Sequence, residues 1–245
     1  METRPQLTDR QIHILKAIID EYIGTAEPVG SETLEKKYSL GVSPATIRNE
    51  MVRLTQLNYL HQPHASAGRA PTPQALQYYV EHLMKQKDMS VAEEVSVKEK
   101  VWDYRSETDK FLREATRTLA QKTKALAFTA TEEGDMYYAG AANILGMPEF
   151  FDYELTYDLL AALDQTGFWW NMVGQREDSF DVLLGEAFGP SSFLTQCGVI
   201  YAKFETPKLH GAVGVIGPSR LNYPYVIPVV RYVGSLIDEL GVRWT

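Results

Sequence analysis

The chain has 245 residues, 44% of them apolar and 23% charged, a composition typical of a soluble globular protein with one large or two average domains. No apolar run reaches the roughly 18 residues that cross a bilayer, and the first residues lack the apolar core of a secretory signal, so we expect a cytoplasmic protein. A single cysteine, Cys197, excludes a disulfide framework and a thiolate metal cluster, and we expect it to be buried.

The net charge of −8 is distributed unevenly along the chain. Residues 1–87 hold 10 Lys and Arg against 9 Asp and Glu, a balance of +1, whereas residues 88–245 hold 14 against 23, a balance of −9. Because DNA phosphates respond to the local field of the docked face, the acidic total does not exclude nucleic-acid binding. The acidic remainder is expected to lie away from the DNA.

Three helices are predicted near the N-terminus. Thr8 with Gln11 three residues later matches a capping box, and apolar residues spaced by three and four continue to Tyr22. Ser31 is expected to cap a short second helix. Ser43-Pro44 opens a third, with Ser at the cap and Pro at the first helical position.

A two-stranded wing follows these helices. Two extended segments, 59–62 and 69–72, flank a turn-rich tip, and a fourth helix is expected from Pro73 to Lys85. Helix, short helix, turn, helix and two-stranded wing is the pattern of a winged helix-turn-helix. We therefore predict an N-terminal winged helix-turn-helix domain over residues 1–87.

The remaining residues, 88–245, predict a separate α+β domain with a mixed sheet and flanking helices. Its opening is interpreted as a polar linker over 85–96 and one long helix over 97–119 with an apolar stripe. Strands are expected at 125–131, 136–140, 181–185, 198–204 and 212–216, and helices at 151–165 and 223–240.

The third helix carries a candidate DNA-reading face. Its apolar stripe is Ile47, Met51, Leu54 and Leu57, and the opposite side is formed by Ala45, Asn49, Val52, Arg53 and Gln56. A solvated surface helix could show the same pattern, but Arg, Asn and Gln are the residues that read base edges in the major groove. The adjoining wing carries His64 and Arg69 but no acidic residue.

The candidate DNA-binding residues lie in this helix and in the wing. Ser43 and Thr46 at the helix N-terminus can contact phosphate, and Arg48, Asn49 and Arg53 can contact bases or phosphate. The wing candidates, for backbone or minor-groove contact, are His64, Ser66, Gly68 and Arg69. Gly68 is also expected to occupy a turn position with positive φ.

Several long segments resemble one known family, HrcA, the heat-inducible repressors of chaperone operons. They are LTDRQIHILKAIIDEYIGTAEPVGSETL, GVSPATIRNEMVRLTQLNYLHQPHASAGRAPT, YYAGAANILGMPEF and GAVGVIGPSRLNYPYVIPVVRYVGSLI. The resemblance implies a homodimer that binds an inverted-repeat operator in double-stranded DNA, is released by heat, and is kept active by the GroEL chaperonin. It also implies a GAF-like fold for the C-terminal domain.

This sequence is shorter than the family pattern. The segment ALAFTAT passes almost directly into EEGDMYYAG, so the dimerisation domain that the family inserts there is absent from this sequence. We therefore take the long helix over 97–119 as the substitute candidate for the dimer contact.

Neither an enzyme nor a metal or cofactor site is indicated. Gly211, Gly214 and Gly217 do not have nucleotide-loop spacing and are better explained by tight strand packing with a turn at Gly217-Pro218. Phe168-Trp169-Trp170 is expected to be core. Two alternatives remain open: a ligand-gated regulator with an effector pocket near these tryptophans, and a DNA-binding scaffold without sequence specificity.

Overall fold

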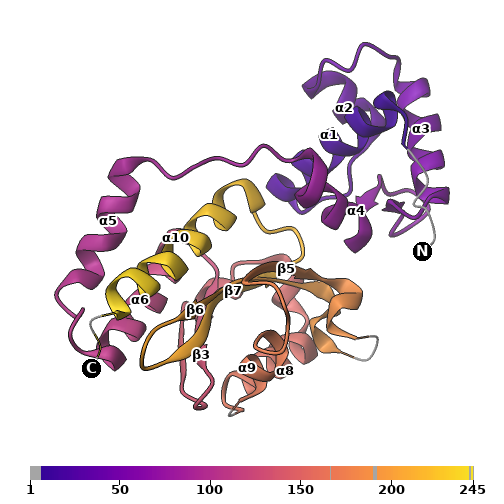
Figure 1. The fold of residues 1–245 in the computed structure, drawn as a ribbon. Coiled ribbons are helices and arrows are strands. Elements are labelled where there is room, and N and C mark those ends of the chain that lie inside the picture. The colour runs from indigo at the N-terminus through magenta and orange to yellow at the C-terminus, as the bar shows by residue number, and fades with distance from the viewer. Residues whose placement is uncertain (1–6, 166, 190–191, 243, 245) are drawn as a thin grey trace. The chain divides into compact units, whose positions relative to one another are not determined.

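The computed structural model describes residues 7–165, 167–189, 192–242 and 244, and the chain divides into two compact units, one ending at Lys85 and the other beginning at Gln86 (Figure 1). The first unit is mainly helical, and the second is built around a five-stranded sheet. The predicted α+β class is confirmed.

The first unit holds three helices, a short hairpin and a further helical segment. The elements are α1 (Asp9–Thr25), α2 (Ser31–Lys37), α3 (Pro44–Gln56), β1 (Leu60–His61), β2 (Ala70–Pro71), α4 (Pro73–Tyr78) and the π-helix η1 (Tyr79–Leu83). The helical segment after β2 therefore ends two residues before the predicted Lys85.

The helix starts follow local capping chemistry. The predicted capping box is present at α1, where the Gln11 amide donates to Thr8 Oγ1 at 3.3 Å and the Thr8 amide donates to Gln11 Oε1 at 3.0 Å. Ser43 caps α3 as predicted. The prediction for α2 is wrong by one residue, because Gly30 is its cap and Ser31 its first helical residue.

The second unit begins with two helices rather than one. Its elements are α5 (Val91–Trp102), α6 (Thr108–Thr123), β3 (Leu126–Thr131), β4 (Met136–Ala139), α7 (Ala141–Ile144), η2 (Pro148–Phe151), α8 (Tyr153–Leu163), α9 (Phe168–Val173), β5 (Phe180–Leu184), η3 (Gly185–Phe188), η4 (Phe193–Gln196), β6 (Cys197–Glu205), β7 (His210–Pro218) and α10 (Tyr223–Gly241). The predicted linker is shorter than expected, since Ser90 caps α5.

The single long helix predicted over 97–119 is wrong. The chain leaves the helix at 103–107, where Asp and Ser favour turns over helix interiors, and α6 packs against α5. A hydrogen bond of 2.7 Å from Lys100 Nζ to Gln121 Oε1 joins the two. Most of the predicted apolar stripe is thereby buried within the unit, as Val97 and Phe111 show, whereas Tyr104 is exposed.

The sheet is antiparallel throughout, in the order β4-β3-β7-β6-β5. Helices α6 and α10 cover one face, and α8 and α9 lie on the other (Figure 1).

Trp169 is 1% exposed and its ring lies 5.3 Å from that of Phe128, so its predicted place in the core is confirmed. Cys197 is buried, as expected, and burial raises the pKa of its thiol to about 12.

We expected the dimerisation domain that the family inserts to be absent between the segments that form β3 and β4. These two strands are joined by a tight hairpin. The Thr131 amide donates to the Asp135 carbonyl at 3.0 Å, and the Asp135 amide donates to Thr131 Oγ1 at 3.0 Å.

Gly214 packs tightly in β7, since a Cβ there would lie 2.5 Å from the Ile200 carbonyl oxygen. The predicted turn at Gly217-Pro218 is wrong, because β7 continues to Pro218.

Candidate nucleic-acid interface

Helix α3 has one buried side and one exposed side. Ile47, Met51 and Leu54 are buried, while Leu57 is only half-buried. The exposed residues are Ala45, Arg48, Asn49, Val52, Arg53 and Gln56. The structure thus gathers three of the candidate side chains, Arg48, Asn49 and Arg53, on one surface that can form hydrogen bonds.

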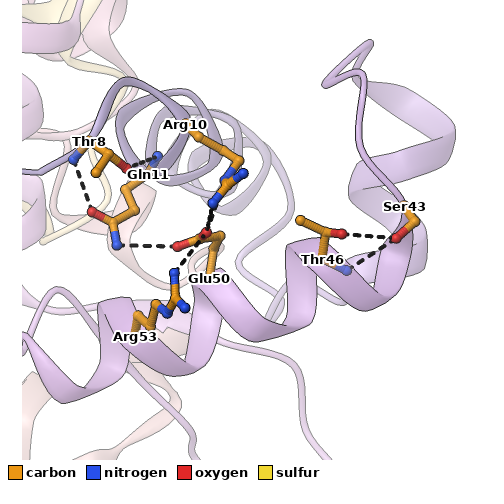
Figure 2. Close-up of polar contacts among 7 residues, drawn as sticks. All are labelled: Thr8, Arg10, Gln11, Ser43, Thr46, Glu50 and Arg53. Atoms are coloured by element: carbon orange, nitrogen blue, oxygen red, sulfur yellow. Dashed lines mark hydrogen bonds and ion pairs between the residues drawn. The ribbon is translucent and has the colours of Figure 1, made fainter.

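The N-terminus of α3 presents two hydroxyl groups. Ser43 Oγ accepts from the Thr46 amide at 3.3 Å and lies 3.0 Å from Thr46 Oγ1 (Figure 2). The first turn of this 13-residue helix holds no acidic residue, so the positive end of the helix dipole is not offset there. Amides, hydroxyls and dipole together suit a phosphate group.

A groove of about 360 Å³ lies between α3, the start of α2 and the β1–β2 loop. It is lined by Gly30, Ser31, Arg48, Met51, Val52, Gln62, Ala65, Ser66, Ala67, Gly68 and Arg69. Four candidates, Arg48, Ser66, Gly68 and Arg69, therefore share one concave surface. His64 is exposed at the loop tip but does not line the groove.

The β1–β2 loop is held in shape by a residue that the sequence analysis did not single out. The side-chain amide of Gln62 donates to the carbonyls of Ala65 and Ala67, both at 2.9 Å. This side chain organises the tip that presents Ser66. No local signal in the sequence separates this glutamine from a solvated one.

Gly68 and Arg69 fix the hairpin to the segment between α1 and α2. Arg69 and Val29 exchange backbone hydrogen bonds of 2.8 and 2.9 Å. The positive φ predicted for Gly68 is wrong. The glycine is instead required by close approach, because a Cβ would lie 2.4 Å from the Val29 carbonyl oxygen. Arg69 Nε also donates to Thr55 Oγ1 at 3.2 Å, which ties the hairpin to α3.

A buried carboxylate under the exposed face of α3 was not predicted. Glu50 accepts hydrogen bonds from Arg10 and Gln11 of α1 and from Arg53 of its own helix (Figure 2). Burial alone would raise the pKa of Glu50, but hydrogen bonds from Arg10 and Gln11 and the nearby Arg53 charge lower it below its usual value. No local pattern predicts the contacts with α1, since Arg10 and Gln11 lie 40 and 39 positions from Glu50.

Neither a metal site nor a membrane-spanning helix is found in the part of the chain that the structure describes. Among the described residues, no group of three or more His, Cys, Asp or Glu side chains could hold a metal ion. Within the same ranges, no helix is both long and apolar enough to cross a membrane.

Comparison with known proteins identifies the family. The family model described as HrcA protein C terminal domain matches residues 52–227. The heat-inducible transcription repressor HrcA of Carboxydothermus hydrogenoformans is 42% identical over 335 residues, covering 96% of this chain and 98% of the relative. That of Symbiobacterium thermophilum is 26% identical over 338 residues, covering 96% and 99%.

A solved structure shares the fold along nearly the whole chain. It is described as the crystal structure of a hypothetical protein, with a TM-score of 0.77 at 20% identity, and covers 97% of this chain and 99% of that one. The 335-residue alignment exceeds the 245 residues of this chain by 90, so the Carboxydothermus relative carries at least that many residues without a counterpart here. On the matched family model and the 42% identical relative, this chain belongs to the HrcA family.

Proposed function

We propose that this chain represses transcription of heat-shock chaperone operons, binding an inverted-repeat operator as a homodimer and releasing it under heat stress. The observation that carries the proposal is the 42% identity, along almost all of both chains, to a protein named heat-inducible transcription repressor. Negative regulation of heat-shock transcription follows from membership in this family.

In this proposal the first unit is a winged helix-turn-helix. Helix α3 enters the major groove, with Arg48, Asn49 and Arg53 toward the bases or the flanking phosphates. Ser43 and Thr46 bind phosphate at the helix N-terminus. The β1–β2 hairpin is the wing, and His64, Ser66, Gly68 and Arg69 approach the DNA backbone or the minor groove. The exposed face of α3 and the shared groove support this assignment.

The second unit, with a GAF-like fold, supplies the two-fold symmetry that an inverted repeat requires. The boundary between the DNA-binding domain and the second domain is proposed to lie between residues 87 and 88. The chain acts in the cytoplasm, and GroEL is its proposed chaperonin partner, as in the family that it resembles. No cofactor or catalytic residue is proposed.

The ligand-gated alternative has less support. The recess beside Trp169 and Trp170, lined by described residues such as Thr131 and Met136, is too small to hold a water molecule. The relatives, heat-inducible transcription repressors, also favour the heat-shock function.

The test is a binding titration of the full chain with two duplexes. One carries the inverted repeat upstream of the organism's chaperonin operon, and the other is a shuffled sequence of the same length. Preference for the repeat by about a thousandfold or more is expected of a specific repressor. Equal affinity for both duplexes would refute the proposal in favour of a non-specific DNA-binding scaffold.

The same titration tests the reading face. Asn49→Ala should cost about 1–3 kcal/mol on the inverted repeat and much less on the shuffled duplex, because a lost base contact is sequence-dependent. Glu35→Ala, an exposed change on α2, is the control and should leave both affinities close to those of the parent chain. An Asn49→Ala protein with the parent's preference would exclude Asn49 as a base reader.

A further inference from the structure

Two arginines from different helices share one buried carboxylate (Figure 2). Arg10 of α1 donates through Nε and Nη2 to Glu50 Oε1 at 2.9 and 2.5 Å, and Arg53 Nη1 lies 3.3 Å from the same oxygen. The Glu50 side chain is 3% exposed, whereas those of Arg10 and Arg53 are 52% and 61% exposed. The carboxylate thus lies beneath two guanidinium groups that remain open to solvent.

This cluster lies on one flank of the exposed face of α3. Arg48 and Arg53 are five residues apart, which places them about 140° apart around the helix. Arg48 borders the groove with Arg69 and the β1–β2 loop, and Arg53 borders α1 through Glu50 and Arg10. A helix in the major groove has a phosphate strand on each side, so each flank of α3 would face one strand.

We infer that Arg10 is a further DNA-binding residue, which contacts the phosphate strand on the α1 side of α3, and that Glu50 is a positioning residue for Arg10 and Arg53. The inference rests on the proposed function, because it requires α3 to face DNA. Two guanidinium groups on one carboxylate leave a net charge of +1, so the cluster attracts phosphate. Side chains held in place before docking lose less conformational entropy when they bind.

The first test removes the Arg10 guanidinium from the full chain. Arg10→Gln should weaken binding to the inverted repeat and to the shuffled duplex alike, by about threefold to tenfold, and should lower the salt slope by about one unit. Arg117→Gln is the matched control, since it removes the same charge from an exposed side chain of α6. It should leave the salt slope unchanged.

The second test separates positioning from net charge. Glu50→Gln removes a negative charge, so net charge alone predicts tighter DNA binding, whereas loss of positioning predicts binding weaker by about threefold or more. Adding Arg10→Gln to Glu50→Gln should then weaken binding by less than Arg10→Gln does in the parent chain, because the two changes act on one cluster. Circular dichroism on each variant establishes that the comparison is between folded proteins.

The outcomes distinguish this inference from the proposed function. A parent chain that prefers the inverted repeat, together with an Arg10→Gln protein of unchanged affinity and salt slope, overturns the role of Arg10 alone. A folded Glu50→Gln protein that binds more tightly overturns the positioning role. A parent chain without preference for the repeat refutes the proposed function, whatever the variants show.

Discussion

At the scale of single residues, Gly68 is the position where one added methyl group has the clearest consequence. A Cβ there would lie 2.4 Å from the Val29 carbonyl oxygen, so Gly68→Ala must displace the hairpin or the segment before α2. We expect the free energy of unfolding to fall by about 1–3 kcal/mol, as overpacking commonly costs, and DNA affinity to fall with it. Chemical denaturation and operator titration measure the two effects.

Gly24 provides the matched control for that change. It lies in α1, and a Cβ there would meet nothing within 4 Å, so Gly24→Ala should be neutral or stabilise by up to about 1 kcal/mol. If Gly68→Ala were as stable as Gly24→Ala, close approach would not be the reason for glycine at position 68.

Residues whose partners are close in sequence were predictable, and those with distant partners were not. Thr8 with Gln11, and Ser43 with the start of α3, are capping pairs that lie within one helical turn. Glu50 was not among the predicted site residues. Its burial depends on Arg10, 40 positions away, which no local pattern reveals.

At the scale of elements, the Glu50 cluster joins α1 to α3 and makes their packing sensitive to acid. The pKa of Glu50 is lowered in the folded chain, so its contribution to stability is complete above the ordinary pKa of glutamate. That contribution is lost as the pH falls through the lowered value. The parent chain should therefore lose more stability on acidification than Glu50→Gln, which has no carboxylate to protonate there.

Thermal unfolding of the first unit as a function of pH measures this difference. At neutral pH Glu50→Gln should be less stable by about 1–3 kcal/mol, and the gap should narrow in acid. Glu35→Gln on the exposed surface of α2 is the control and should follow the parent curve closely. A gap that stays constant from neutral to acidic pH would contradict the role assigned to the carboxylate.

Element order was largely predictable, whereas the break between α5 and α6 was not. Apolar residues at helical spacing continue past Val101 to Phe111, so periodicity alone favours one helix. The break is stabilised because α5 folds back on α6 and both Val101 and Phe111 become buried. This packing is a tertiary effect that periodicity does not reveal. The five strands were found because each is a short apolar run between turn residues.

At the scale of the whole molecule, the net charge of each unit bears on which unit binds DNA, and the missing insertion bears on how the chain dimerises. The balance of +1 over 1–87 and of −9 over 88–245 supports the proposal that the first unit approaches DNA. The tight β3–β4 hairpin shows that this chain completes its sheet without a long insertion between those strands. Dimerisation is therefore proposed to use the surface of the second unit itself.

The most direct measurement is light scattering combined with operator titration across a temperature ramp, on the full chain and on residues 1–87. Because affinity for an inverted repeat depends on the folded, paired fraction, the full chain should be dimeric and should lose operator occupancy as heat separates the dimer. The fragment, a compact unit of its own, should be monomeric and bind weakly. A full chain that remains monomeric on its operator, or a dimer that binds undiminished well above growth temperature, would contradict this account.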